Sequence, residues 1–537
     1  MSSFNLVDAP WIPVQAGGGQ TALSLRDALV NAHGIDDLAP PRPTMVPALL
    51  RQVLLPVAID ALGVPRSEDD WSERWSTGRF DPAAINDYLD RHHDRFDLFH
   101  PTQPFAQVGG LESTTGQTKP SSLLVPSIAS GNNVPLFSAR LESEPPDLSP
   151  AEAALWLVHA HCWDTAAIKT GAAGDPRVKR GKTTGNPTGP LGQFEVVAPI
   201  GRNLFDTLLL NTRILADGLP ADDRPQWRVK PADATWQERP PCGLLDLFTW
   251  QSRRIRLFPS EETDGTVVRE VLVCAGDRLI VNHDLEPHAS WRHNRRPRAN
   301  QPPRSPRRPR PGRHVWQGLD AQLALHPPED GEVEASRLIQ QAGNVLETIG
   351  DDYPLRVLTV GLLYGNQSAV VDHAVADLMP LPVAALREHQ PVWELLVGVV
   401  MQTEDVSKAL NGLHADLRRA RSGEPIPWDR GQRPTTELTQ LLDPAVRRLL
   451  AGLQQEPDRE DEAAWAWQET AHREVWRLAE RMLDAVPPAA FAGRDDPRGN
   501  YVYRPANAEA TFRMRVAKAL PDRDALSATF KETKPHG

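Results

Sequence analysis

Cysteine is scarce in this chain of 537 residues. The three cysteines, Cys162, Cys242 and Cys274, lie 80 and 32 residues apart. Those spacings fit neither a zinc knuckle nor a dense disulfide framework. This cysteine usage predicts a reduced, cytoplasmic protein.

The chain also has few of the features of secreted and membrane-spanning proteins. No apolar run approaches the roughly 20 residues that a membrane span requires. The first residues, Met-Ser-Ser-Phe-Asn, include no basic segment followed by an apolar core. We therefore expect no secretory signal and no membrane partner. The composition is 40% hydrophobic and 24% charged, which indicates a globular chain long enough for two or three domains.

Positive charge is concentrated in two stretches, although the formal net charge is -11. Residues 291–314 contain nine arginines and no acid, and residues 165–184 contain five basic residues against one aspartate. Proline and glycine predict that both stretches lie outside helices and sheets. Basic loops on an acidic body suit a polyanion, because each phosphate contact releases counterions. The alternative is a solvated linker with incidental charge. The candidate DNA-contact residues are Lys169, Lys179, Arg180, Lys182, Arg304, Arg307, Arg308 and Arg310.

The sequence predicts an α+β protein with a helical C-terminal part. Residues 1–375 mix short strands, helices and long loops, with a helix at Met45–Leu62 and a hairpin at Val267–Asn282 that turns at Ala275-Gly276-Asp277. After residue 380 the apolar period is 3.6 and strand patterns are absent. Breaks at 421–434, 457–459 and 487–505 divide residues 380–537 into four helices, which predicts a four-helix bundle.

No catalytic constellation is visible in the sequence. A Walker-type phosphate loop, a G-x-S-x-G and an H-E-x-x-H are all missing. His92, His93 and Asp94 could be taken for metal ligands of a phosphohydrolase. However, adjacent residues on a helix point about 100° apart and do not readily chelate one ion.

Several segments together resemble the CasA-type large subunit of Cascade, the type I-E CRISPR surveillance complex. The matching motifs lie in chain order from residue 4 to residue 369. They are FNLVD with PWIPV (4–14), FDLFHPTQPFAQ (96–107), LVPSIASGNNVPLF (124–137), the spaced pattern Leu204, Thr207, Leu209, Leu210 and Asn211, and YGNQSA (364–369).

The resemblance implies a subunit without catalytic activity or a cofactor. Such a subunit holds the 5′ end of the CRISPR RNA (crRNA) and inspects double-stranded target DNA for the protospacer-adjacent motif (PAM). It starts strand separation and R-loop formation, contacts the displaced strand, and gives the helicase-nuclease a docking surface. The N-terminal part, 1–375, would recognise the PAM and the crRNA handle. The other partners would be the remaining Cascade subunits.

The resemblance also assigns candidate site residues. A PAM reader of this family works from the minor groove, which displays mostly an A·T-versus-G·C pattern. Glycine lets the backbone approach the groove floor. The glycine-loop position corresponds to Gly171, Ala172, Ala173 and Gly174, and the hairpin position that carries lysine in the family corresponds to Arg278. Asn366 matches the amide that meets the groove, and Gln367 matches the wedge beneath the PAM. The crRNA-handle loop corresponds to Asn132, Asn133 and Phe137.

Two other functions remain open at this point. One is a metal-dependent nuclease or phosphohydrolase that uses His92, His93 and Asp94. The other is a nonspecific nucleic-acid-binding protein, which would bind duplexes with and without a PAM equally well.

Overall fold

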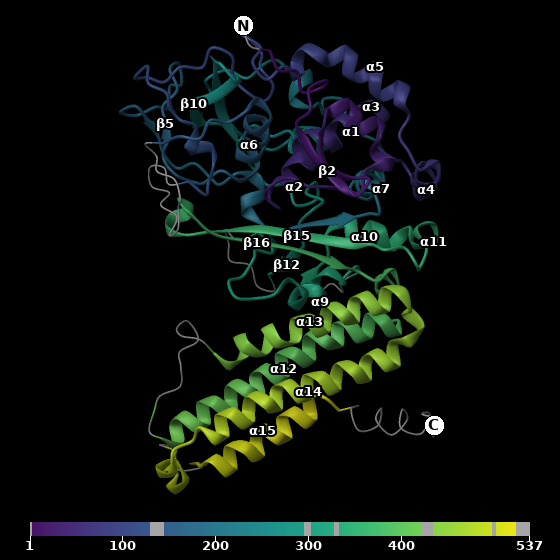
Figure 1. The fold of residues 1–537 in the computed structure, drawn as a ribbon, viewed down its shortest axis with the longest axis vertical. Coiled ribbons are helices and arrows are strands. Elements are labelled where there is room, and N and C mark those ends of the chain that lie inside the picture. The colour runs from purple at the N-terminus through teal and green to yellow at the C-terminus, as the bar shows by residue number, and fades with distance from the viewer. Residues whose placement is uncertain are drawn as a thin grey trace. The chain divides into compact units, whose positions relative to one another are not determined.

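The chain forms two compact units in the computed structural model (Figure 1). The structure describes residues 3–128, 144–294, 302–326, 332–421, 423, 433–496 and 501–521. The first unit comprises Met1–Arg310, His326–Thr348 and Leu355–Leu378, and the second comprises Pro311–Leu325, Ile349–Pro354 and Met379–Gly537. The sequence suggested a single cut between residues 375 and 380, whereas the second unit also takes in two earlier segments.

Tryptophan hydrogen bonds join the first of these segments, Pro311–Leu325, to the helices of the second unit. The indole of Trp316 donates to Asp443 at 3.1 Å, and the indole of Trp393 donates to the carbonyl of Leu323 at 2.9 Å. Both bonds join residues that are far apart in the sequence.

The first unit is built on three main sheets. One sheet has the order β2-β1-β3, another pairs the long hairpin β9–β10 with β4, β5 and β6, and a third has the order β16-β15-β7. Two smaller sheets join β11 to β8 and β13 to β12 and β14. The strands are β1 Ile12–Ala16, β2 Gly19–Leu23, β3 Asp37–Leu38, β4 Lys119–Pro120, β5 Lys169–Thr170, β6 Lys182–Thr183, β7 Val196–Ile200, β8 Glu238–Arg239, β9 Arg253–Glu262, β10 Gly265–Ala275, β11 Arg278–Leu279, β12 Trp291–His293, β13 Arg304–Pro306, β14 Val333–Glu334, β15 Arg356–Tyr364 and β16 Val371–Pro380.

Short helices pack around these sheets. They are α1 Leu25–Val30, α2 Met45–Leu49, α3 Leu55–Leu62, α4 Glu68–Thr77, α5 Pro82–His92, α6 Pro150–Trp163, α7 Leu204–Leu210, α8 Leu244–Phe248 and α10 Arg337–Asn344. Helix α9 Leu319–Gln322 belongs to the second unit, and α11 Leu346–Ile349 lies where the chain passes from the first unit to the second. Helix α6 begins with a capping box, in which Ser149 and Glu152 satisfy each other's backbone N–H groups. This helix leads directly into the candidate site.

The predicted helix at Met45–Leu62 is present as one continuous helical segment. It consists of α2, a π-helical turn at Leu50–Leu54 and α3. Pro56 lacks the N–H that a regular helix would use here, and a wider turn accommodates that loss. By length and composition this segment could cross a membrane, but 78% of it is buried inside the fold. Such burial is typical of a core helix.

The predicted hairpin at Val267–Asn282 is wrong. Strand β10 pairs instead with the preceding strand β9, from Gly265 opposite Glu262 to Ala275 opposite Arg253. The chain then passes Gly276, where a Cβ would lie 2.4 Å from the backbone N of Arg253. After this close approach, β11 pairs in parallel with β8. The Ala-Gly-Asp sequence therefore marks a crossing of two backbones and not a hairpin turn.

The prediction that both basic stretches lie outside sheets is also wrong. Lys169–Thr170 pairs with Lys182–Thr183, and Trp291–His293 pairs with Arg304–Pro306. The β-branched threonines favour the first pairing. Proline is tolerated in the second, because β13 is an edge strand of its sheet.

The second unit contains the four long helices that the sequence predicts. They are α12 Pro391–Ala420, α13 Pro434–Gln455, α14 Glu460–Asp484 and α15 Pro505–Ala519, and the short strands β17 Arg494–Asp495 and β18 Val502–Tyr503 precede α15. Proline stands in the first turn of α12, α13 and α15, where its missing N–H costs no intrahelical bond. The leucine stripes of α12 and α13 and the Trp467, Ala471, Val475 stripe of α14 are largely buried.

Candidate nucleic-acid interface

A buried ion cluster anchors the segment that follows α6. The carboxylate of Asp164 lies 2.5 Å from Nζ of Lys169 and also accepts a hydrogen bond from Arg253. Burial by itself would raise the pKa of Asp164, but the two cations outweigh it and lower that pKa to about 2. Lys169 is only 6% exposed. The structure thus places Lys169 in an internal ion pair and not on the exposed face with the other predicted contacts.

The glycine-loop residues have two different roles in the fold. Gly171 and Ala172 are buried, and a Cβ on Gly171 would lie 2.4 Å from Cγ1 of Val178. Ala173 and Gly174 are exposed, and Gly174 has a φ of +88°. A side chain is strained in that backbone conformation. Of these four residues, Ala173 and Gly174 form the exposed tip, in which the N–H of Ala173 already donates to the carbonyl of Glu112 at 2.8 Å.

Trp236 connects the glycine loop to Arg278. The guanidinium carbons of Arg177 and Arg278 lie 4.5 and 4.1 Å from the centre of the indole ring. The indole N–H donates to Asp175 in the loop at 3.1 Å, and Arg278 donates to the carbonyl of Thr184 at 3.0 Å. Sequence reasoning missed Trp236, because no motif distinguishes it from the other tryptophans.

Gln367 lies at the tip of the hairpin formed by β15 and β16. Its side chain is exposed and its φ is +52°, a left-handed conformation that is uncommon for residues other than glycine. The turn is closed by a bond from the N–H of Gly365 to the carbonyl of Val370. The N–H of Ala166 donates to the carbonyl of Ser368 at 2.8 Å. That bond fixes the tip beside the segment that leads to the glycine loop. The structure describes only the backbone of Asn366.

The hairpin tip shares cavities with both basic stretches. Gln367 and Arg308 line a cavity of about 290 Å³ together with Thr188. Arg180 and Lys182 line another, of about 500 Å³, that includes Ala369. The structure thus brings the hairpin tip, the glycine-loop segment and one arginine of the 291–314 stretch into one region.

The remaining basic residues that the sequence predicts as DNA contacts differ in their exposure and in whether they have an ion-pair partner in the protein. Lys179 and Arg310 are exposed. The backbone of Arg307 bonds to Ser290 and Glu195, and Arg304 lies 3.2 Å from the carboxylate of Glu334. Arg304 therefore has an internal partner, whereas Arg308 and Arg310 present their charge to solvent. The predicted handle-loop residues Asn132, Asn133 and Phe137 lie outside the described residues.

The histidines of the metal hypothesis have other partners. The Nε2 atom of His93 lies 2.7 Å from Asp8, and its Nδ1 atom lies 3.3 Å from the amide of Asn5. The ring of His92 packs edge-on against Tyr88. Within the described ranges, no three His, Cys, Asp or Glu side chains are grouped so that they could hold a metal ion.

The sequence and the fold of this chain both match a known family. The model of the family "CRISPR-associated protein Cse1" matches residues 5–478. The chain therefore belongs to the Cse1 family, the CasA-type large subunits of Cascade.

Relatives and solved structures agree with this assignment. CRISPR-associated protein CasA/Cse1 of Thermus thermophilus is 29% identical over 513 residues, covering 90% of this chain and 93% of the relative. Cse1 of Thermobifida fusca has a TM-score of 0.81 at 33% identity, covering 97% of this chain and 98% of its own. Cse1 of Acidimicrobium ferrooxidans has a TM-score of 0.80 at 32% identity, covering 97% and 99%.

Proposed function

We propose that this subunit recognises the PAM in double-stranded DNA and begins R-loop formation. The observation that carries the proposal is the position of Gln367. It stands exposed at a hairpin tip whose backbone is bonded to Ala166, five residues before the glycine loop. A reader of the minor groove and a group that enters the base stack must lie close together, since the first base pair to open adjoins the PAM.

The exposed loop tip supports the reading role. At Ala173 and Gly174 the largest side chain is a methyl group, so the backbone can approach the floor of a groove about 6 Å wide. The nearby cations Arg180 and Lys182 are exposed and suit the flanking phosphates. Contacts to a groove with a degenerate pattern would accept several related PAM sequences.

The strained tip supports the opening role. A non-glycine residue with a positive φ is retained only when the surrounding structure fixes it. Here the neighbouring backbone bonds of Gly365 and Ser368 do so. A flat amide that is carried outward on this fixed backbone can replace a stacked base, which offsets part of the few kcal/mol that unstacking costs per step.

The wider assignments follow from family membership. We propose that the subunit works without catalytic activity in the cytoplasm, where it contacts the crRNA handle, the displaced strand and the other Cascade subunits and helps to recruit the helicase-nuclease. Sequence specificity for the target would then reside in the RNA, while the protein reads only the PAM.

The test is binding of a PAM library by the complex assembled from this protein, crRNA and the other subunits. Enrichment of a restricted set of PAM sequences is expected. Equal binding of all sequences would contradict the proposal and indicate a nonspecific nucleic-acid-binding protein. Cleavage of DNA or a phosphoester by the isolated protein, dependent on a divalent metal, would indicate the nuclease alternative.

A further inference from the structure

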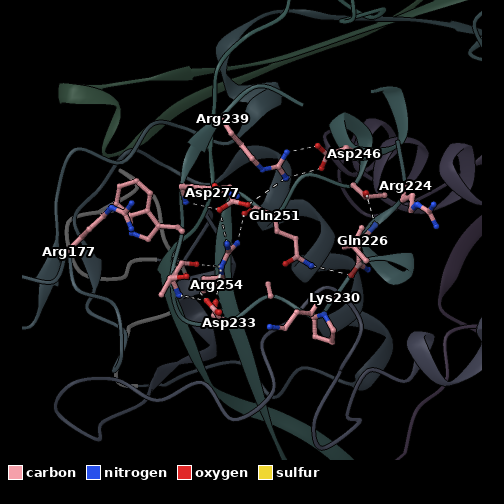
Figure 2. A pocket seen from close by; sticks show the side chains of 17 residues that line it. Arg177, Arg224, Gln226, Lys230, Asp233, Arg239, Asp246, Gln251, Arg254 and Asp277 are labelled. Atoms are coloured by element: carbon pink, nitrogen blue, oxygen red, sulfur yellow. Dashed lines mark hydrogen bonds and ion pairs between the residues drawn. The ribbon is translucent and has the colours of Figure 1, made fainter. Parts of the chain in front are cut away.

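A polar cavity of about 510 Å³ lies in the first unit, next to Trp236 (Figure 2). Figure 2 shows Arg177 on one side of the cavity, Arg224 on the other, and Arg254 between them. The loop that carries Gln226 and Val229 is held in place by Arg95, which donates to both of their carbonyls at 3.2 Å. The cavity therefore has a fixed outline on a packed part of the fold.

The basic side chains that line the cavity outnumber the acidic ones that could pair with them. Arg239 is paired with Asp246, with two bonds of 2.5 and 3.0 Å, and Arg254 is paired with Asp277 at 2.7 Å. Arg177, Arg224 and Lys230 also line the cavity, and none of the three makes an ion pair with another described residue.

The acid that remains is already engaged. The Oδ1 atom of Asp233 accepts from the N–H and the hydroxyl of Thr235 at 2.8 and 2.6 Å. These bonds are the main cause of a lowered pKa of Asp233, which keeps this carboxylate ionised. Asp233 is thus the one lining acid whose carboxylate lacks an arginine partner, and it faces the three unpaired cations Arg177, Arg224 and Lys230, so the cavity keeps a net positive charge.

The interior also offers a hydrogen-bond donor without an acceptor. The buried Nε2 atom of Gln226 has no partner among the described atoms, although its Oε1 accepts from Gln251 at 3.2 Å. Buried polar groups are nearly always satisfied, so such an atom indicates that a ligand or water completes the site. Phosphate oxygens and base carbonyls are both suitable acceptors.

We propose that this cavity binds a nucleotide of single-stranded DNA, with its phosphodiester held by Arg177, Arg224 and Lys230. The inference rests on the proposed function, because Arg177 and Trp236 belong both to the cavity wall and to the support of the glycine loop. A strand released beside Gln367 needs a cationic partner nearby. Cavities of roughly 300–1,000 Å³ accommodate ligands of nucleotide size.

The test uses the full-length protein and a fluorescent 12-nucleotide single strand of DNA. In the Arg224→Ala/Lys230→Ala variant, affinity should fall at least about five-fold, and the slope of log K against log salt should flatten by roughly 0.7 for each phosphate that the variant no longer neutralises. Both side chains are exposed, so folding should be unaffected. The control variant, Arg79→Ala/Arg91→Ala, removes two exposed cations elsewhere on the same unit and should leave the slope unchanged.

Several results would overturn the proposal. Equal losses in both variants would show that only total charge matters, and no loss in either would show that the cavity is unused. Competition by free dTMP or inorganic phosphate at concentrations similar to the oligonucleotide would assign the cavity to a small phosphate compound. The same protein preparations are assembled into the complex and compared on duplexes with and without a PAM. Preserved PAM discrimination in a complex whose cavity proves unused would leave the proposed function intact.

Discussion

The backbone N–H of Ala166 donates a hydrogen bond of 2.8 Å to the carbonyl oxygen of Ser368, more than 200 positions later in the chain. Ala166 lies two residues after the partly buried Asp164 and five before Gly171. The candidate wedge and the candidate groove reader therefore share one support, and its rigidity depends on the ion cluster around Asp164.

The first prediction concerns that cluster. Asp164→Asn leaves Lys169 and Arg253 buried without their counter-charge, which should lower the free energy of unfolding by about 3–5 kcal/mol. The pKa of Asp164 is about 2, below its unfolded value near 3.9. Its contribution to stability is therefore present above about pH 4 and is lost as the pH falls toward 2. Urea unfolding between pH 2 and 7 measures both effects.

The matched control for this change is Asp94→Asn. The side chain of Asp94 is 89% exposed, so the same chemical change should alter stability by less than about 0.5 kcal/mol. If Asp164→Asn is equally mild, the cluster does not hold the segment in place.

The second prediction separates space from backbone strain in the glycine loop. Ala173→Val adds bulk at the exposed tip, where φ is not positive, and should weaken PAM-dependent binding while non-PAM binding hardly changes. Gly174→Val adds similar bulk but also forces a β-branched residue to a φ of +88°, so it should additionally lower stability. Binding to paired duplexes and thermal melting are measured for both variants.

A different pattern would assign the loop another role. If Ala173→Val weakens binding to both duplexes equally, the tip is a general phosphate contact or a folding element. Gly171→Ala serves as a further comparison, since its new Cβ would meet Val178 inside the loop and should disturb folding first.

The third prediction is that Gln367 acts in strand opening. Gln367→Ala keeps a non-glycine residue at the positive φ and removes the amide, so initial contact with PAM duplex should survive while R-loop formation slows. A target with the first base pairs already open should restore the rate, because the unstacking cost of a few kcal/mol per step has been met. If the open target gives no rescue, Gln367 does not act as a wedge.

The fourth prediction is that, within the 291–314 stretch, the exposed arginines contribute to DNA binding and the arginine that is paired with an acid does not. Arg308→Ser/Arg310→Ser should weaken DNA binding without changing PAM preference, and should flatten the salt dependence by roughly 0.9 for each phosphate that is no longer neutralised. Arg304→Ser should leave the salt slope nearly unchanged, because Arg304 is paired with Glu334. A larger slope change for Arg304→Ser than for the double variant would contradict this division.

The helices of the second unit could be predicted from the sequence because apolar periodicity and helix-start residues are signals that lie within each helix. The 3.6 period of Leu438, Leu442 and Val446, and prolines such as Pro434 and Pro505 in the first turns of helices, define the C-terminal bundle without reference to the rest of the chain. The partner of a strand is not local. Val267–Cys274 reads equally well as the first or second strand of a hairpin, and only tertiary packing selects its pairing with β9.

Within the candidate site, the sequence could propose residues only where a motif resembled that of a family. The segments around Gly171 and Gln367 could be located by resemblance to a family. The burial of Lys169 could not, because it depends on Asp164 and on the distant Arg253. Trp236 was missed for the same reason, since its contacts with Arg177 and Arg278 join separate loops.

The most direct test of the central claim is permanganate reactivity of PAM-adjacent thymines in a fully paired target. The target is bound by the surveillance complex assembled with this protein, with PAM and without it, and by the same complex lacking this subunit. We predict reactive thymines only when both the subunit and the PAM are present. Equal reactivity without the PAM, or unchanged reactivity without the subunit, would contradict the account.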